Sequence, residues 1–272
     1  MKTALILSGG GAKGCFQVGA MKRLIEDGVK PDIIFGTSTG ALQAAGYAHI
    51  GMYELEKVWL SIKAKSDVMG SNWMNLWRDG KHHMRPLKKK LELIEKSSGF
   101  RLCDAVVTRV CMETGEVEYI DFDHPEFLLS VLASACVPFV STPIKIGDKH
   151  YVDGGVRDQV PVRELKRLVA EGYKVIVIST KPVMINPDPW KMPKIFPLWK
   201  IIVRVADDIL PTETWLDELR QVKEMQLAGA PVELIIPQRA WMGTEEYDPE
   251  KIRLGIAMGY AAEPTNLKEV KL

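Results

Sequence analysis

The apolar positions near the start of the chain alternate between short strand patterns and helical patterns. TALILS at residues 3–8 is a short apolar run typical of a buried strand, and residues 15–28 then place apolar side chains at helical spacing. The same order follows, with DIIFG at residues 32–36 and a helix rich in small residues at 40–50. Because a tight glycine loop separates each strand from its helix, the pattern predicts a parallel sheet with helices on its faces.

The pattern of strands and helices continues toward the C-terminus. We expect a hairpin at residues 105–122, which turns at Thr114 and Gly115, and a helix at 126–138, ended by Pro138. The other expected elements are helices at 53–63, 86–98, 162–172, 214–229 and 248–264, and strands at 149–156, 174–180 and 232–237. The predicted fold is a three-layer α/β/α domain with a mainly parallel sheet. It spans residues 1–272, with a motif-bearing core at about 2–180 and a C-terminal part at 198–272.

Composition is that of an ordinary globular protein. The formal net charge is +1, which gives no argument for nucleic acid as a partner. The four cysteines form no C-x-x-C pair, so we expect reduced packing residues in a cytoplasmic protein, with no metal site. The apolar run at residues 4–7 is too short for a signal peptide, and no segment reaches the ~18 apolar residues of a membrane span.

A serine between two glycines follows the second predicted strand. GTSTG at residues 36–40 has the G-x-S-x-G spacing of a nucleophile elbow, in which Gly36 and Gly40 remove Cβ atoms that would collide as strand folds onto helix. The alternative is a plain turn in which Ser38 caps the following helix. The pattern alone leaves both interpretations open.

A glycine-rich loop follows the first predicted strand. SGGGAKG at residues 8–14 exposes backbone N–H groups at the start of a helix, which suits either a bound phosphate or the oxyanion of an acyl-transfer intermediate. Gly9, Gly11 and Gly14 also satisfy the dinucleotide fingerprint G-x-G-x-x-G. However, Asp32 opens the second strand instead of closing it, so the expected ribose partner is misplaced. Cys15 stands where a P-loop needs lysine.

An aspartate begins a third glycine turn, YVDGGV at residues 151–156. Taken alone, Asp153 followed by glycine indicates only a turn. Together, the three glycine-flanked turns carry backbone donors, a hydroxyl and a carboxylate to strand ends, and open α/β folds place their sites at the carboxyl edge of the sheet.

The chain resembles the patatin-like phospholipase family in four stretches. They are SGGGAKG, GTSTG, ASACVP at residues 133–138, and DGGVRDQVP at 153–161. The resemblance covers residues 2 to about 180 and implies an enzyme that cleaves fatty acyl esters of phospholipids, lysophospholipids or related lipids without a cofactor. It implies that Ser38 is the nucleophile and Asp153 the base, with an oxyanion hole formed by Gly9, Gly10 and Gly11. Because an aspartate is a weak base for a serine hydroxyl, we expect a modest hydrolase.

Three residues depart from the family pattern. Lys13 replaces a frequent arginine, Gln159 a usual asparagine, and Phe139 a frequent glycine. Lys13 either steers an anionic head group toward the site or lies on a solvated helix start. Ser134 is expected to pack within its helix or to bond back to it.

Other residues bear on the reaction and on its partners. Strict alternation puts His150 on the strand face opposite Asp153, so we expect no histidine to complete a triad. Trp190, Phe196 and Trp199 lie among lysines in a proline-rich loop at residues 181–200, which predicts either peripheral membrane contact or a surface loop folded over the core. No calcium loop is present. Besides a hydrolase and a dinucleotide- or phosphate-binding protein, a non-catalytic adaptor on the hydrolase fold is an alternative. It is disfavoured because both residues of the predicted dyad are present.

Overall fold

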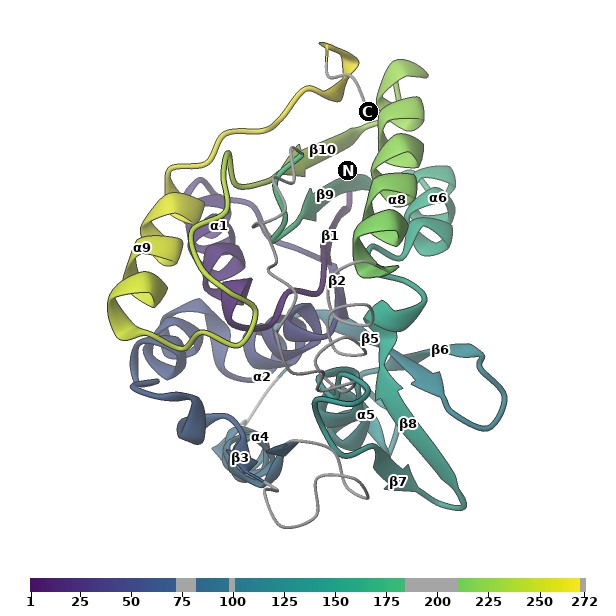
Figure 1. Cartoon of the computed structure of the whole chain (residues 1–272). Helices are drawn as coiled ribbons and strands as arrows, with labels where there is room; N and C mark the ends of the chain where they lie inside the picture. The colour runs from purple at the N-terminus through teal and green to yellow at the C-terminus, as the bar shows by residue number, and fades with distance from the viewer. Residues whose placement is uncertain (72–81, 98–100, 184–209, 270–272) are drawn as a thin grey trace, which may run out of the picture.

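The computed structural model describes the chain except residues 72–81, 98–100, 184–209 and 270–272. Within the described residues an eight-stranded sheet has the order β10-β9-β1-β2-β5-β8-β7, and β6 pairs with β5 (Figure 1). The strands of this sheet are β1 Thr3–Leu7, β2 Ile33–Thr37, β5 Asp104–Cys111, β6 Val117–Asp121, β7 Ile144–Ile146, β8 Lys149–Asp153, β9 Lys174–Ile178 and β10 Val232–Ile235. The strands β10, β9, β1, β2 and β5 pair in parallel, while β6, β8 and β7 pair antiparallel. A separate antiparallel pair joins β3 Gly70–Ser71 to β4 His82–His83.

Helices cover both faces of the sheet. The helices are α1 Cys15–Glu26, α2 Thr39–Leu60, α4 Arg85–Ser97, α5 Phe127–Ser134, α6 Val162–Ala170, α8 Leu210–Leu227 and α9 Pro249–Tyr260. Along β1, Leu5 and Leu7 belong to the apolar cluster shared with α1, α2, α4, α5 and α9, whereas Ala4 and Ile6 belong to the cluster shared with α6 and α8. Successive side chains of a strand point to opposite faces, so a continuous apolar run is what a sheet buried on both sides requires. The predicted three-layer α/β/α fold is confirmed.

The position of the antiparallel strand β8 brings its last residue, Asp153, close to the turn at Ser38. Arg109 of β5 pairs with Glu118 of β6 on one edge and with Asp153 of β8 on the other. On that second edge β2 stops where Thr37 pairs with Thr108. Strand β8 therefore meets β5 just beyond the end of β2, and its last residue lies beside the turn that begins at Ser38.

Several element boundaries differ from the expectation. Helix α5 ends at Ser134, before the predicted stop at Pro138, and α2 runs on to Leu60 across Gly51, whose φ is 74°. The predicted hairpin is confirmed as β5 and β6. That one domain spans the chain stays a prediction, which the pairing of β10 with β9 supports.

No helix of the described residues is both long and apolar enough to cross a membrane. The loop residues Trp190, Phe196 and Trp199 lie outside the part of the chain that the structure describes.

Candidate active site

Ser38 occupies a strained turn between β2 and α2. Its φ is 57° and its ψ is −120°, a backbone conformation that costs a non-glycine residue about 1–3 kcal/mol. The flanking glycines make the turn sterically feasible: a Cβ on Gly36 would lie 2.2 Å from the carbonyl oxygen of Gly40, and one on Gly40 would lie 2.2 Å from that of Leu7. The Ser38 side chain makes no capping hydrogen bond to α2, so the interpretation of Ser38 as a helix cap is wrong.

The end of α5 holds the backbone of this turn. The Ser38 N–H donates to Ser134 Oγ at 2.8 Å, and Ser134 is fully buried. The expected packing of Ser134 within its helix is confirmed by its complete burial, and its hydroxyl in addition accepts a bond from a residue far away in the sequence. Bonded in this way, the Ser38 amide is satisfied inside the core while the residue keeps its positive φ.

The same end of α5 also holds Asp153. The Asp153 N–H donates to the carbonyl oxygen of Cys136 at 2.9 Å, and the Asp153 carboxylate Oδ1 accepts the Gly155 N–H at 2.7 Å. Asp153 is 4% exposed. One short segment, residues 134–136, therefore fixes the backbone of both predicted dyad residues.

Ser38 and Asp153 line one polar cleft with the glycine-rich loop. Its lining includes Gly9, Gly10, Gly11, Lys13, Gln159 and Lys181. A Cβ on Gly9 would lie 3.2 Å from the Ser38 Cβ, so the loop passes directly beside the serine. The structure thus brings the residues of the three glycine-flanked turns to one place.

Two threonines from later in the chain hold the glycine-rich loop in place. Thr180 Oγ1 donates to the Gly9 carbonyl oxygen at 2.6 Å, and the Ala12 N–H donates to the Thr244 carbonyl oxygen at 2.7 Å. A Cβ on Gly11, whose φ is 58°, would lie 2.3 Å from that same Thr244 oxygen. In the described residues none of the Gly9, Gly10 and Gly11 amides donates to a backbone oxygen. All three glycines line the cleft beside Ser38.

A buried carboxyl group supports the loop that follows Asp153. Glu218 of α8 is 5% exposed, and its two oxygens accept the N–H groups of Gln159 at 2.7 Å and Val160 at 2.9 Å. Burial raises the pKa of Glu218 to about 9. The Gln159 side chain donates to the Gly155 carbonyl oxygen at 3.1 Å, and its Oε1 lies 3.0 Å from where a Cβ on Gly9 would be. Gln159, a departure from the family pattern, thus packs between the aspartate turn and the glycine-rich loop.

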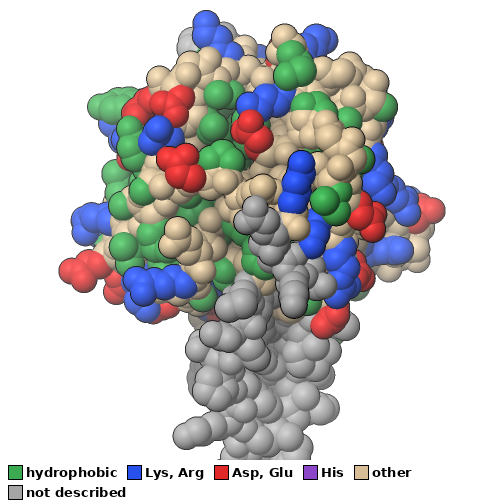
Figure 2. Space-filling model, turned by 90° about the horizontal axis from the view of Figure 1, so that it is seen from above, with side chains coloured by type: hydrophobic (Ala, Val, Ile, Leu, Met, Phe, Trp, Pro, Cys, Tyr) green, Lys and Arg blue, Asp and Glu red, His purple; other side chains and the backbone are tan. Residues whose placement is uncertain are grey.

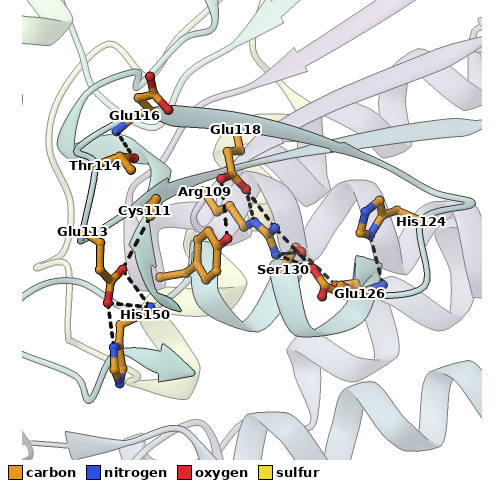
Figure 3. A network of polar contacts seen from close by, with 11 residues as sticks. Arg109, Cys111, Glu113, Thr114, Glu116, Glu118, His124, Glu126, Ser130 and His150 are labelled. Atoms are coloured by element: carbon orange, nitrogen blue, oxygen red, sulfur yellow. Dashed lines mark hydrogen bonds and ion pairs between the residues drawn. The ribbon is translucent and has the colours of Figure 1, made fainter. Parts of the chain in front are cut away.

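His150 has a partner outside the cleft. Its ring Nδ1 lies 2.8 Å from Glu113 Oε1, and its backbone N–H donates to the same carboxylate (Figure 3). These two contacts lower the pKa of Glu113 to about 2. In the same network the buried Arg109 side chain contacts Glu118 and Ser130. The Arg109 contact to Ser130 anchors α5 one turn before Ser134.

A second, apolar cavity meets the polar cleft at the serine. It holds about 940 Å³ of empty space, part of it open to solvent, and Gly11, Ser38, Val137 and Thr244 line both spaces. The apolar lining includes Leu55, Trp59, Ile62, Met84, Leu87 and Leu91. Gln43 is one of its polar lining residues, and its Oε1 accepts the Trp59 Nε1–H at 2.8 Å. The lining of this cavity is mostly apolar, with Lys90 and Glu245 among its members, whereas the cleft on the other side of Ser38 is lined by Lys13, Asp153 and Lys181.

Comparison with known proteins places this geometry in a family. A family model described as patatin-like phospholipase matches residues 5–166, more than half of the chain. The chain belongs to the patatin-like phospholipase family. The matched residues include Ser38, Asp153 and the three loop glycines.

Individual relatives within the patatin-like family match only part of the chain. It is 27% identical over 183 residues to lysophospholipase NTE1 of Kluyveromyces lactis, covering 63% of this chain and 12% of that protein. It is 28% identical over 194 residues to a patatin-like phospholipase domain-containing protein of Aspergillus oryzae, covering 60% of this chain and 27% of that protein. The chain thus matches no more than about a quarter of the length of these relatives. VipD from Legionella pneumophila shares the fold, with a TM-score of 0.53 at 14% identity over 95% of this chain and 65% of VipD.

The predicted site residues fall into two groups. Gly9, Gly10, Gly11, Lys13, Ser38 and Asp153 line the polar cleft, whereas Gly36 and Gly40 lie in the turn at Ser38. Sequence reasoning missed the supporting roles of Thr180, Glu218 and Thr244. No cluster of three or more His, Cys, Asp and Glu side chains among the described residues could hold a metal ion.

Proposed function

We propose that this chain is a serine acyl-ester hydrolase of lipids, with Ser38 as the nucleophile and Asp153 as its base. The observation that carries the proposal is the position of Ser38. It lies on a strained turn where a polar cleft with Asp153 and three glycines meets an apolar cavity. Family membership and the name of the relative lysophospholipase NTE1 support a lipid ester as the substrate.

The proposed reaction passes through an acyl-enzyme. Ser38 Oγ attacks the ester carbonyl carbon and its proton passes to the Asp153 carboxylate. The amides of Gly9, Gly10 and Gly11 stabilise the oxyanion, a contribution worth about 3–4 kcal/mol for each donor in comparable sites. The bond to the alcohol breaks and Asp153 returns the proton to it; water then hydrolyses the Ser38 ester by the same steps.

The apolar cavity and the polar cleft would hold different parts of the substrate. The apolar cavity would take the acyl chain, because burying it there stabilises binding by about 0.8 kcal/mol per CH₂ group. The alcohol part would face the polar cleft, where Lys13 and Lys181 provide positive charge for an anionic head group. This arrangement favours phospholipids or lysophospholipids over uncharged esters.

The nucleophile is tested by labelling with a fluorophosphonate probe. The wild type is expected to take up the label covalently, and Ser38→Ala to take up none. Label that persists in Ser38→Ala would show that another residue is the nucleophile.

The base is tested by comparing two variants on a soluble short-chain ester. Asp153→Asn should lower kcat by about 10³-fold or more, because the serine proton has no acceptor. His150→Ala should keep most of the activity, because its side chain is bound to Glu113. The reverse pattern would contradict the Ser38 and Asp153 assignment.

The third glycine of the dinucleotide fingerprint does not separate the two alternatives, because close packing of the helix is also its role in dinucleotide-binding folds. Gly14 packs against α2, since a Cβ there would lie 2.1 Å from Thr39 Oγ1. The cleft beside the loop holds Ser38 and Asp153, which phosphate binding does not need. We therefore expect no spectroscopic change when a dinucleotide is added to the protein.

A further inference from the structure

Helix α4 carries a concentration of positive charge. Its thirteen residues, RPLKKKLELIEKS, include five lysine and arginine side chains against two glutamates, a net charge of +3, whereas the whole chain has +1. On the face shown in Figure 2, basic and acidic side chains are interspersed. Figure 1 places α4 at the end of the molecule away from α6 and α8.

The inner side of α4 forms part of the apolar cavity beside Ser38. Leu87, Leu91 and Ile94 line this cavity, and the first two are buried. Their spacing of three and four residues puts all three on one helix face. The helix is therefore the wall between the expected acyl chain site and the outside.

The outer side of α4 combines lysines with an exposed leucine. Lys88, Lys89 and Lys96 are exposed, and Leu93 is 67% exposed. Leu93 lies four residues after Lys89 and three before Lys96, so these three side chains share a face. The nearby ion pair of Lys88 and Glu92 has a 3.9 Å separation at an exposed position and offsets little of this charge.

We propose that α4 docks on an anionic lipid surface. Lys88, Lys89 and Lys96 would contact the lipid head groups, while Leu93 enters the boundary below them, the arrangement by which amphipathic basic helices lie in a membrane interface. The inference builds on the proposed function: a docked α4 places the wall of the apolar cavity against the bilayer, so that a lipid chain has a short path to Ser38.

Binding to vesicles is measured by co-sedimentation with the Ser38→Ala protein, so that the result does not depend on hydrolysis. The protein is expected to bind vesicles of phosphatidylcholine with phosphatidylglycerol, and to bind phosphatidylcholine alone far more weakly. Each basic residue near an anionic surface contributes about fivefold to partitioning, so Lys89→Gln with Lys96→Gln should weaken binding about 30-fold. High salt should weaken wild-type binding as well.

A matched control uses two exposed basic residues on the opposite face of the sheet. Arg163→Gln with Lys166→Gln on α6 changes the net charge by the same amount and should leave vesicle binding within about twofold. Leu93→Ser should weaken binding at unchanged net charge. The variant with Lys89→Gln and Lys96→Gln should keep wild-type activity on a soluble short-chain ester, because neither lysine lines the cavity.

Three outcomes would overturn the proposal. They are equal binding to charged and uncharged vesicles, unchanged binding of the α4 lysine variant, and equal losses in the α4 and α6 variants. None of these depends on whether Ser38 is the nucleophile, which the probe labelling decides separately.

Discussion

Ser134 Oγ accepts the backbone N–H of Ser38 at 2.8 Å across 96 residues of sequence. The bond joins the end of α5 to the turn that carries the proposed nucleophile. Because Cys136, two residues later, accepts the Asp153 N–H, a shift of this helix end would move both proposed catalytic residues.

Ser134→Ala is expected to lower kcat on a soluble ester by about 10- to 100-fold. The change leaves the Ser38 amide buried without an acceptor, which costs about 1–3 kcal/mol and loosens the strained turn. Steady-state kinetics and urea unfolding measure the two effects.

Ser130→Ala is the matched control for that experiment. Ser130 is equally buried on the same helix, one turn earlier, but its hydroxyl contacts Arg109 and the Glu126 carbonyl oxygen. It should lower stability with little effect on kcat. Equal losses of kcat in both variants would show that Ser134 acts only through the stability of α5.

Gly40→Ala should destabilise the fold and abolish activity. The added Cβ would lie 2.2 Å from the Leu7 carbonyl oxygen, a backbone atom that cannot move without shifting β1. Overpacking of this kind costs about 1–3 kcal/mol or more, measured by urea unfolding. Gly243→Ala is the control, because its Cβ would meet nothing closer than 3.6 Å. If the Gly40→Ala protein had wild-type stability and activity, the turn would be looser than described.

The stability contributed by Glu218 should decline as pH rises. Burial raises its folded-state pKa from 4.5 to about 9, so the folded protein keeps a proton that the unfolded chain releases in this interval. The contribution is complete below pH 4.5 and is lost progressively as pH approaches 9. Urea unfolding of wild type and Glu218→Gln across this range should show their difference in unfolding free energy shrinking with pH. A difference independent of pH would mean that Glu218 does not titrate on unfolding.

The apolar cavity predicts a dependence on acyl chain length. Val58 lines the cavity and is partly exposed, so Val58→Trp fills space without removing a core contact. Activity on a long-chain ester should fall at least tenfold more than activity on an acetyl ester, because only the long chain needs the cavity. Val58→Thr, with nearly the same shape, should leave the ratio of the two activities almost unchanged; a ratio unaffected by tryptophan would place the acyl chain elsewhere.

The sequence predicted those parts of the site that depend on local backbone geometry. GTSTG and the SGGGAKG loop indicate sharp turns because glycine alone fits where a Cβ would meet backbone, as at Gly36 and Gly40. The three-layer fold followed from two-sided burial of runs such as β1.

Long-range supports could not be predicted in the same way. The serine at position 134 looked like an ordinary helical residue, and Thr180, Glu218 and Thr244 stand in no motif, because the partners of each lie far away in the sequence. The end of this helix was also predicted wrongly, at Pro138 instead of Ser134. Ser134 and Cys136 at this helix end accept N–H groups from Ser38 and Asp153, partners that lie far away in the sequence or beyond Pro138. These contacts form only when distant parts of the chain meet in the folded protein.

The residues of the proposed site are spread along the chain, so they are synthesised at different times. During synthesis the serine turn leaves the ribosome more than a hundred residues ahead of Asp153, and the threonines that clamp the glycine loop follow later still. A nascent chain therefore carries the proposed nucleophile Ser38 before the proposed base Asp153 and before the contacts that hold the glycine-rich loop. The complete proposed site forms only after the chain has been synthesised as far as Thr244.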